Sequence, residues 1–346
     1  MNIIIIEKFL TDFRCCFQHT VTFNWFLVII LGFIVRSDHL GVSSFVRCFY
    51  LQSKAYNSLL FFFRSSAWSL TDLLDRWVEI VCNKFPLLYI NNRPILVGDG
   101  IKVCKEAQKM PGVKKLHQES ANSGKGETIL GHHVGSVSII IGNLKKIFCV
   151  PLQSRIHEGV DEIRFVENIN NKKPTLVTKM AQLVLETAIS TNKLCYIALD
   201  AYFAVGPAFK YFKNAVNKKN EQLVHIITRA KSNYVGFHDC LYSDKKFNDE
   251  DKVILKEMFA FQDCFETVEL NIYSEIKTIK YLCLDLLWKP LGDLVRFVLI
   301  IDGNDQYILM SSDIKLSPEN IITIYSYRCK IELSFKFLKH IIGGFY

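Results

Sequence analysis

Three acidic residues of this sequence, Asp99, Asp200 and Glu332, have the residue types and surroundings of metal ligands. Asp99 and Asp200 each follow a short apolar run, so both are expected at the ends of buried strands. Carboxylates suit Mg²⁺, which prefers oxygen ligands and keeps water and phosphate oxygens at its remaining positions. Two Mg²⁺ ions, with Mn²⁺ as a substitute, support the cleavage of phosphodiesters. The sequence therefore predicts that all three residues are metal ligands and catalytic residues, although the Gly-Asp-Gly context of Asp99, taken alone, is more typical of an ordinary turn.

Glu332 is accompanied by three residues that could contact phosphates, Tyr325, Arg328 and Lys339. All four lie in residues 317–341, a segment predicted to form one helix because it begins with Ser-Pro-Glu, a typical helix N-terminus. At about 100° per residue, the four side chains share a stripe roughly 60° wide. A carboxylate flanked by a phenol and two cations predicts a metal ligand with phosphate-binding groups beside it.

The elements that position these residues predict an α/β fold in four segments. Residues 1–90 read as a mainly helical N-terminal domain, whose scattered basic residues either bind DNA or form a solvated face. Residues 91–231 alternate apolar strands with helices and form the first part of the core. Residues 232–315 are rich in predicted strands, with one predicted helix at 249–261, and are interpreted as an insertion in that core. Residues 316–346 are predicted to close the core with the catalytic helix.

The composition is that of a globular protein, with 346 residues, 50% of them hydrophobic and 22% charged. The net charge of +8 suits a polyanionic partner, although many proteins without one are equally basic. The eleven cysteines are scattered, with no C-x-x-C pair, which favours free thiols in a reducing compartment. The one strongly apolar run, residues 25–35, is shorter than the about 20 residues that a bilayer span requires. It is predicted to be a buried helix, and no membrane partner is expected.

A four-residue pattern within the predicted closing helix carries a resemblance to a known family. Residues Tyr325, Arg328, Glu332 and Lys339 match, without a gap, the Y-x2-R-x3-E-x6-K signature of bacterial insertion-sequence transposases of the insertion-sequence-four type. Four further stretches resemble the same family: SLLFFFRSSAW at 58–68, LVGDGIKVCKEAQKMPGVKKLHQES at 96–120, YIALDAYFAVGPAF at 196–209 and HIITRAKSN at 225–233. The likeness covers about residue 40 to the end of the sequence.

The resemblance implies a DDE transposase with an RNase H-like catalytic core interrupted by a β-rich insertion. Its acidic triad would be Asp99, Asp200 and Glu332, with Tyr325, Arg328 and Lys339 on the DNA. The reaction would be Mg²⁺-dependent cleavage of the terminal inverted repeats and transfer of the 3′-hydroxyl into target DNA. A homodimer on DNA and a cytoplasmic, nucleoid-associated location in bacteria are expected.

Two further expectations come with the resemblance. A Trp of the insertion can stack on a base flipped out of the duplex, and Trp288 is the candidate, with a core Trp as the alternative. The sequence ends seven residues after Lys339, where members of the family usually continue into a further helical segment. That short end favours an alternative function, an inactive remnant that binds element ends as an inhibitor. An RNase H-like nuclease of unrelated role is a third hypothesis, but it would not need the stripe beside Glu332.

Overall fold

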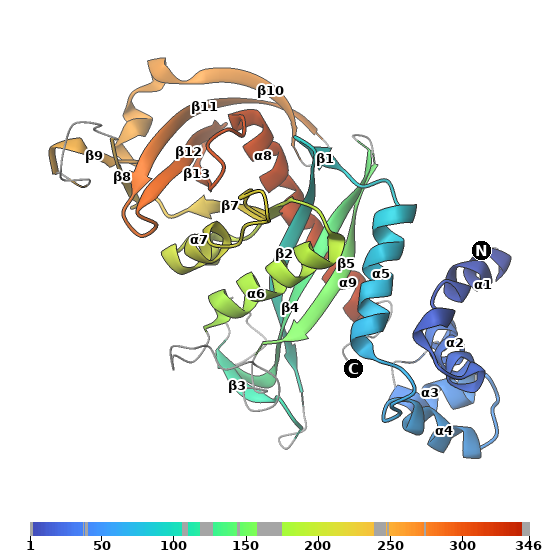
Figure 1. Ribbon diagram of the computed structural model, residues 1–346. Coiled ribbons are helices and arrows are strands. Elements are labelled where there is room, and N and C mark those ends of the chain that lie inside the picture. The colour runs from blue at the N-terminus through green and yellow to red at the C-terminus, as the bar shows by residue number, and fades with distance from the viewer. Residues whose placement is uncertain are drawn as a thin grey trace. The chain divides into compact units, whose positions relative to one another are not determined.

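The structure is a computed structural model of a mixed α/β protein, and the chain divides into two compact units (Figure 1). One unit comprises Met1–Phe85 together with Glu332–Tyr346, and the other comprises Pro86–Ile331. The structure describes residues 3–36, 38, 41–105, 110–117, 127–143, 146–157, 175–238, 247, 249–272 and 275–340.

The first unit is built from helices around an aromatic core. Its helices within the first 85 residues are α1 (Ile3–Thr11), α2 (Thr20–Val35), α3 (Gly41–Cys48), α4 (Lys54–Phe62) and α5 (Leu70–Lys84). Phe17 is 3% exposed and its ring lies 5.0 Å from that of Phe26 and 6.4 Å from that of Trp68. The apolar run at 25–35 lies in α2, which buries Phe26 and Ile29 in this core. Within the described part of the chain, no helix is long and apolar enough to cross a membrane.

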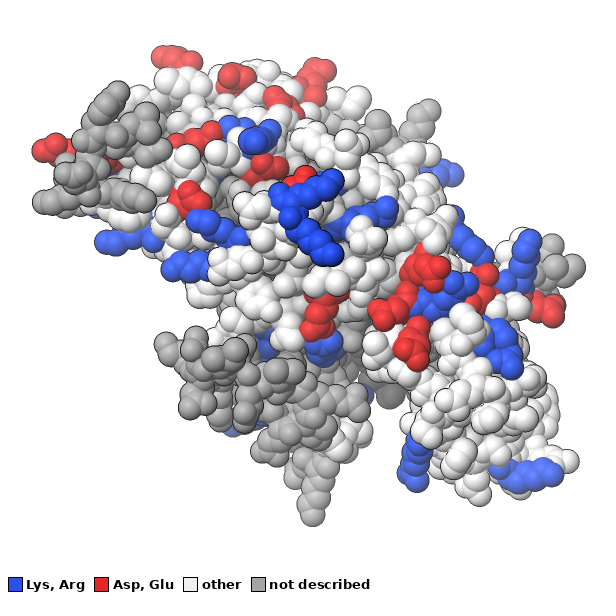
Figure 2. All heavy atoms as spheres, viewed as in Figure 1, with Lys and Arg blue, Asp and Glu red and all other residues white. Residues whose placement is uncertain are grey.

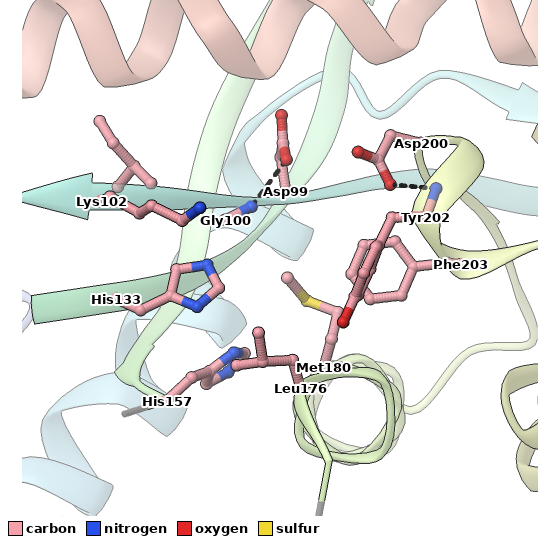
Figure 3. A pocket seen from close by; sticks show the side chains of 11 residues that line it. Asp99, Gly100, Lys102, His133, His157, Leu176, Met180, Asp200, Tyr202 and Phe203 are labelled. Atoms are coloured by element: carbon pink, nitrogen blue, oxygen red, sulfur yellow. Dashed lines mark hydrogen bonds between the residues drawn. The ribbon is translucent and has the colours of Figure 1, made fainter. Parts of the chain in front are cut away.

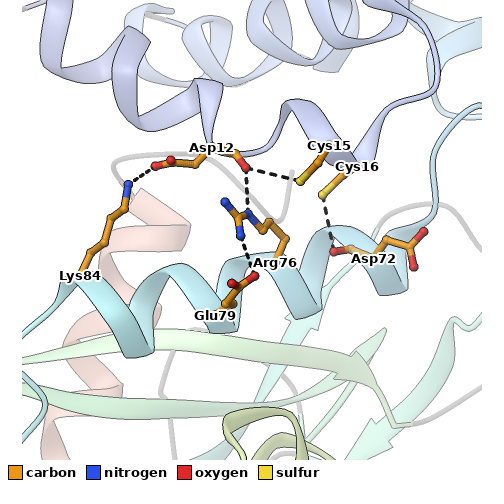
Figure 4. A network of polar contacts seen from close by, with 7 residues as sticks. All are labelled: Asp12, Cys15, Cys16, Asp72, Arg76, Glu79 and Lys84. Carbon is orange, nitrogen blue, oxygen red and sulfur yellow. Dashed lines mark hydrogen bonds and ion pairs between the residues drawn. The ribbon is translucent and has the colours of Figure 1, made fainter.

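A polar network joins α5 to the segment after α1 (Figure 4). Arg76 of α5 donates to the main-chain carbonyl of Asp12 at 2.8 Å and pairs with Glu79 at 2.6 Å. Lys84, in the last turn of α5, pairs with the Asp12 carboxylate. At its other end, α5 is capped by the Ser69 hydroxyl, which accepts a hydrogen bond from a main-chain N–H of the first turn. These contacts fix both ends of α5, and the Ser-x-x-Asp sequence predicts the start of the helix at Ser69.

The second unit contains a sheet of thirteen described strands. These are β1 (Tyr89–Ile90), β2 (Arg93–Cys104), β3 (Lys114–His117), β4 (Thr128–Asn143), β5 (Lys146–Ile156), β6 (Cys195–Ala198), β7 (Val224–Ala230), β8 (Val235–Phe237), β9 (Lys252–Ile254), β10 (Glu266–Ile272), β11 (Glu275–Trp288), β12 (Asp293–Asp302) and β13 (Asp305–Ser311). Strands β5, β4 and β2 are antiparallel neighbours, and β2, β6 and β7 are parallel neighbours. Strand β13 pairs antiparallel with β7, so the strands predicted as an insertion continue the core sheet.

The central strand β2 is buried on both of its faces, because consecutive side chains of a strand point to opposite faces and those of residues 95–97 are unexposed. In β2, Ile95, Leu96 and Val97 are each 0% exposed. Such a continuous apolar run is typical of parallel strands with helices on the sheet. Helix α6 (Leu176–Thr191) packs against β4 and β5, and α7 (Gly206–Lys213) packs against β7. Figure 1 shows both helices lying over these strands.

The structure confirms helical structure over residues 318–340 of the predicted 317–341, but it is not one regular α-helix, because a 3₁₀ turn interrupts it. It consists of α8 (Pro318–Ser326), a 3₁₀ turn (Tyr327–Cys329) and α9 (Lys330–His340). The Ser326 hydroxyl donates to the carbonyl of Thr323 at 2.7 Å, and such back-bonding bends helices. The N-terminal Ser-Pro prediction is confirmed, since Ser317 caps α8 and Pro318 is its first residue.

Two other expectations about elements differ from the structure. Residues 249–261, predicted to be helical, form two short 3₁₀ turns around β9. Strand β2 does not end at Gly98-Asp99-Gly100 but runs on to Cys104 because β4 continues to pair with it. The glycines make room for packing rather than for a turn, since a Cβ at Gly98 would lie 2.7 Å from the Leu199 side chain.

Candidate functional site

The sheet register brings Asp99 and Asp200 to matched positions on neighbouring parallel strands. The last paired residues of β2 and β6 are Val97 and Ala198, and each aspartate lies two residues further along. Because side chains alternate along a strand, a two-residue step keeps both carboxylates on the same face. Neighbouring strands lie about 4.8 Å apart, so the two carboxylates face the same small volume.

The Asp99 carboxylate is held by one main-chain group and one cation. Its Oδ1 accepts the N–H of Gly100 at 2.7 Å, and its Oδ2 lies 3.5 Å from the guanidinium of Arg328. Both side chains are mostly buried, with 20% of Asp99 and 23% of Arg328 exposed. Arg328 lies in the 3₁₀ turn between α8 and α9, so the break in the predicted helix forms the element that brings this cation to Asp99.

The position of Asp200 is fixed through both its side chain and its carbonyl. Oδ1 accepts the N–H of Tyr202 at 3.0 Å, which caps a 3₁₀ turn (Ala201–Phe203). The main-chain carbonyl accepts the hydroxyl of Thr228 at 2.6 Å, and Thr228 is 0% exposed on β7. The sequence prediction that Asp200 ends a strand is confirmed, because β6 ends two residues earlier.

A cavity of about 420 Å³ opens beside the two aspartates (Figure 3). Apolar side chains of Met180 and Leu176 on α6 and of Phe203 line it, together with Lys102 and the ring of Tyr202. In Figure 3 the carboxylates of the two aspartates lie at one side of this cavity and two histidines at the other. The carboxylates of Asp99 and Asp200 therefore border a cavity large enough to hold part of a substrate.

The rings of His133 and His157 each pack over a glycine, and the two glycines are paired across neighbouring strands. Gly100 of β2 pairs with Gly135 of β4. A Cβ at Gly100 would lie 2.4 Å from His133 Nε2, and one at Gly135 would lie 1.9 Å from His157 Cε1. Burial and the neighbouring His133, Lys179 and Arg155 lower the pKa of His157 from 6.5 to about 3. His157 is therefore a neutral ring at ordinary pH.

Sequence reasoning did not identify His157 or the α6 residues as parts of the site. His157 directly follows β5, and its main-chain N–H donates a hydrogen bond to the His133 carbonyl at 2.7 Å, which holds the main chain at this position. The sequence contained only a weak signal for this arrangement. Glycines within predicted strands can indicate that another group, here a histidine ring, lies close over the main chain.

The remaining predicted residues lie on α8, α9 and β11. Tyr325 is half-buried near the end of α8, and Glu332 is exposed in the first turn of α9 and belongs to the other compact unit. Lys339 lies on α9, but the predicted role of its side chain falls outside what the structure describes. Ligation of metal by all three carboxylates stays a prediction, since the described residues contain no group of three or more His, Cys, Asp or Glu that could hold a metal ion.

Trp288 lies in the core of the second unit, at the end of β11. It is 3% exposed, stacks on Tyr234 at 5.7 Å between ring centroids and meets Phe209 edge-on at 5.2 Å. This is the core Trp given above as the alternative to base stacking. A flipped base could reach the ring only if the ring left this packing.

Comparisons with known proteins give little further information. No protein-family model matches the chain, and no curated protein matches it. Among solved structures, the NurA nuclease from Sulfolobus solfataricus is similar at 11% sequence identity, with a TM-score of 0.28, over 80% of this chain and 86% of that chain. Because a TM-score of this size supports no argument about function, the function is argued from the site alone.

Proposed function

We propose that this protein is a DDE transposase that cleaves the terminal inverted repeats of its element and joins the 3′-hydroxyl to target DNA. One observation carries the proposal: Asp99 and Asp200 lie two residues beyond the last paired residues of two parallel strands, at the rim of one cavity. Two-metal phosphodiester chemistry uses carboxylates on rigid elements of this kind. The transposase signature around Glu332 supports the choice of reaction.

The strand order supports an RNase H-like core for this enzyme. The order β5-β4-β2-β6-β7 consists of three antiparallel strands followed by two parallel ones. The first acidic residue lies on the central strand β2, and the second follows β6 beside it. An RNase H-like core has this order and places its acidic pair in this way.

The donor set fits Mg²⁺, because both aspartates offer anionic oxygens on the same face of the sheet. Bound Mg²⁺ would supply an activated water or 3′-hydroxyl and stabilise the leaving oxygen. Arg328, already 3.5 Å from Asp99, would neutralise a phosphate beside the carboxylates. On the resemblance, Glu332 is proposed as the third catalytic residue, and Tyr325 and Lys339 as DNA contacts. A homodimer on the element ends is proposed as the working form.

The test is Mg²⁺-dependent nicking of a duplex that carries the terminal inverted repeat flanking the coding sequence. We expect the natural chain to nick the repeat end and Asp99→Asn to abolish nicking. The Asn amide oxygen can still accept the hydrogen bond from the Gly100 N–H, so this variant removes the negative charge of residue 99 and keeps its local structure. Asp263→Asn is the matched control, because Asp263 is an exposed aspartate in a 3₁₀ turn of the same unit.

Binding without nicking by the natural chain would reject the enzyme and favour the alternative, a remnant that binds element ends as an inhibitor. Nicking that is indifferent to the repeat sequence would instead favour a nuclease of unrelated role. Electrophoretic separation of nicked and joined products distinguishes these outcomes from transposition.

A further inference from the structure

A second cavity, of about 460 Å³, lies beyond Asp200 and carries three cations on its lining. These are Arg229 at the end of β7, Lys231 just after it and Lys256 before a 3₁₀ turn (Glu257–Ala260), and all three are exposed. Among the described residues that line this cavity, none is acidic. We call the set of residues lining this cavity the basic groove.

The basic charge of this groove is a local feature. On the face drawn in Figure 2, Lys and Arg side chains are interspersed with Asp and Glu over both units. The net charge of +8 is therefore not gathered into one broad basic surface on that face. The groove has three cations around one cavity, and none of its described lining residues is acidic. This local cluster is better evidence for phosphate binding than the net charge of the chain.

Aromatic rings form part of the groove wall. Tyr307 of β13 is half-buried, and the guanidinium of Arg229 lies over its ring at 5.3 Å from the centroid. Phe259 contributes a second, buried ring. A planar cation stacked on a ring offers a surface on which a nucleobase can stack in turn.

The groove is adjacent, along the chain, to the candidate catalytic residue Asp200. Ala201, which follows Asp200 in the chain, lines it. Thr228, which bonds the Asp200 carbonyl at 2.6 Å, precedes Arg229 on β7. The groove therefore begins one residue from Asp200, which makes it a candidate site for nucleotides next to a phosphate at the Asp200 carboxylate.

We propose that the basic groove binds an unpaired DNA strand next to the reacting phosphodiester. This inference rests on the proposed function, because it takes DNA as the substrate. Cations along a groove contact the phosphates, while ring surfaces require bases whose faces are open. In a duplex those faces are covered by neighbouring base pairs, so the aromatic wall favours a single strand.

The test measures binding of a short fluorescent oligothymidylate and of the matched duplex to the full chain by fluorescence anisotropy in EDTA. We expect the single strand to bind more tightly than the duplex. The double variant Lys231→Glu/Lys256→Glu should weaken that binding by about tenfold at low salt. Tyr307→Ala should weaken it on the order of tenfold, and Tyr307→Phe should preserve it because the ring remains.

The matched control is Lys218→Glu/Lys219→Glu, which makes the same change of charge on exposed lysines before the opposite end of β7. An equal loss of affinity in this control, or equal affinity for duplex and single strand, would overturn the proposal. Because binding is measured without metal, its outcome is separate from that of the nicking experiment. If the natural chain nicks DNA but the groove variants bind the single strand normally, this inference alone is rejected. If the groove binds the single strand as expected but the natural chain does not nick, the transposase function alone is rejected.

Discussion

At the scale of single residues, Arg328 has two competing partners in the proposed site. It lies 3.5 Å from the Asp99 carboxylate, and in the reaction it would contact a phosphate. A cation so close to a metal ligand opposes a second cation there by like-charge repulsion. Arg328→Gln should therefore tighten Mn²⁺ binding by a few-fold, in line with about 0.2–1 kcal/mol for a partly exposed pair.

The measurement is a Mn²⁺ titration followed by electron paramagnetic resonance, with Arg328→Lys as the variant that keeps the charge. The same Arg328→Gln change should weaken DNA binding, because the proposed phosphate contact is lost. Weaker Mn²⁺ binding in Arg328→Gln would show that the guanidinium supports the carboxylate geometry rather than competing with the metal.

Thr228 is a positioning residue for Asp200. Its buried hydroxyl donates to the Asp200 carbonyl at 2.6 Å, and removing such a bond costs about 1 kcal/mol. Thr228→Val, which keeps the shape, should lower the free energy of unfolding by that amount and slow nicking. Thr228→Ser should restore both, as measured by urea denaturation and by the nicking assay. A variant with full nicking activity would show that the carbonyl needs no such support.

At the scale of elements, the two facing glycines of β2 and β4 make the folding stability depend on pH. Gly100 leaves space for His133, and Gly135 leaves space for His157. The pKa of His157 is lowered from 6.5 to about 3, chiefly by burial and then by His133, Lys179 and Arg155. Between these two values the unfolded chain binds a proton that the folded chain does not. The His157 contribution is therefore complete above pH 6.5 and is lost as pH falls, by up to about 1.4 kcal/mol per pH unit.

His157→Gln should flatten the loss of stability between pH 6.5 and pH 5, whatever its effect on stability at neutral pH. Urea denaturation at both pH values measures the slope. His225 provides a comparison, because burial lowers its pKa to about 4 and it lies at a different place on the sheet, in β7. His225→Gln should reduce the slope independently, and an unchanged slope in His157→Gln would contradict the assigned burial.

The elements also show what could be predicted from sequence. The position of Asp200 at a strand end was predicted correctly because its signal is local: an apolar strand, an aspartate, and a proline at the start of α7. The path of β2 through Asp99 was not predicted, because it depends on pairing with β4, whose partner residues lie well beyond any local sequence window; Asp99, for example, pairs with Ser136. The 3₁₀ turn before α9 follows a serine whose hydroxyl bonds back to the Thr323 carbonyl, an interaction that helical periodicity does not reveal.

At the scale of the whole molecule, the two compact units have separate cores. Three of the four tryptophans, Trp25, Trp68 and Trp77, pack on the helical core, and Trp288 alone lies in the sheet unit. A smaller unit buries a smaller fraction of its surface and is stabilised less. We therefore expect the helical unit to unfold at a lower urea concentration than the sheet unit.

This distribution of tryptophans allows each unit to be followed by itself. In Trp288→Phe, fluorescence reports only the helical unit, and in the triple variant with Phe at positions 25, 68 and 77 it reports only Trp288. The fluorescence midpoint of Trp288→Phe, which reports the helical unit, should fall at a lower urea concentration than that of the triple variant, which reports the sheet unit. Non-coincident transitions are the signature of unfolding that is not two-state. Coincident transitions in both variants would show instead that the two units unfold as one cooperative block, so that residues on either unit, Glu332 included, share a single stability.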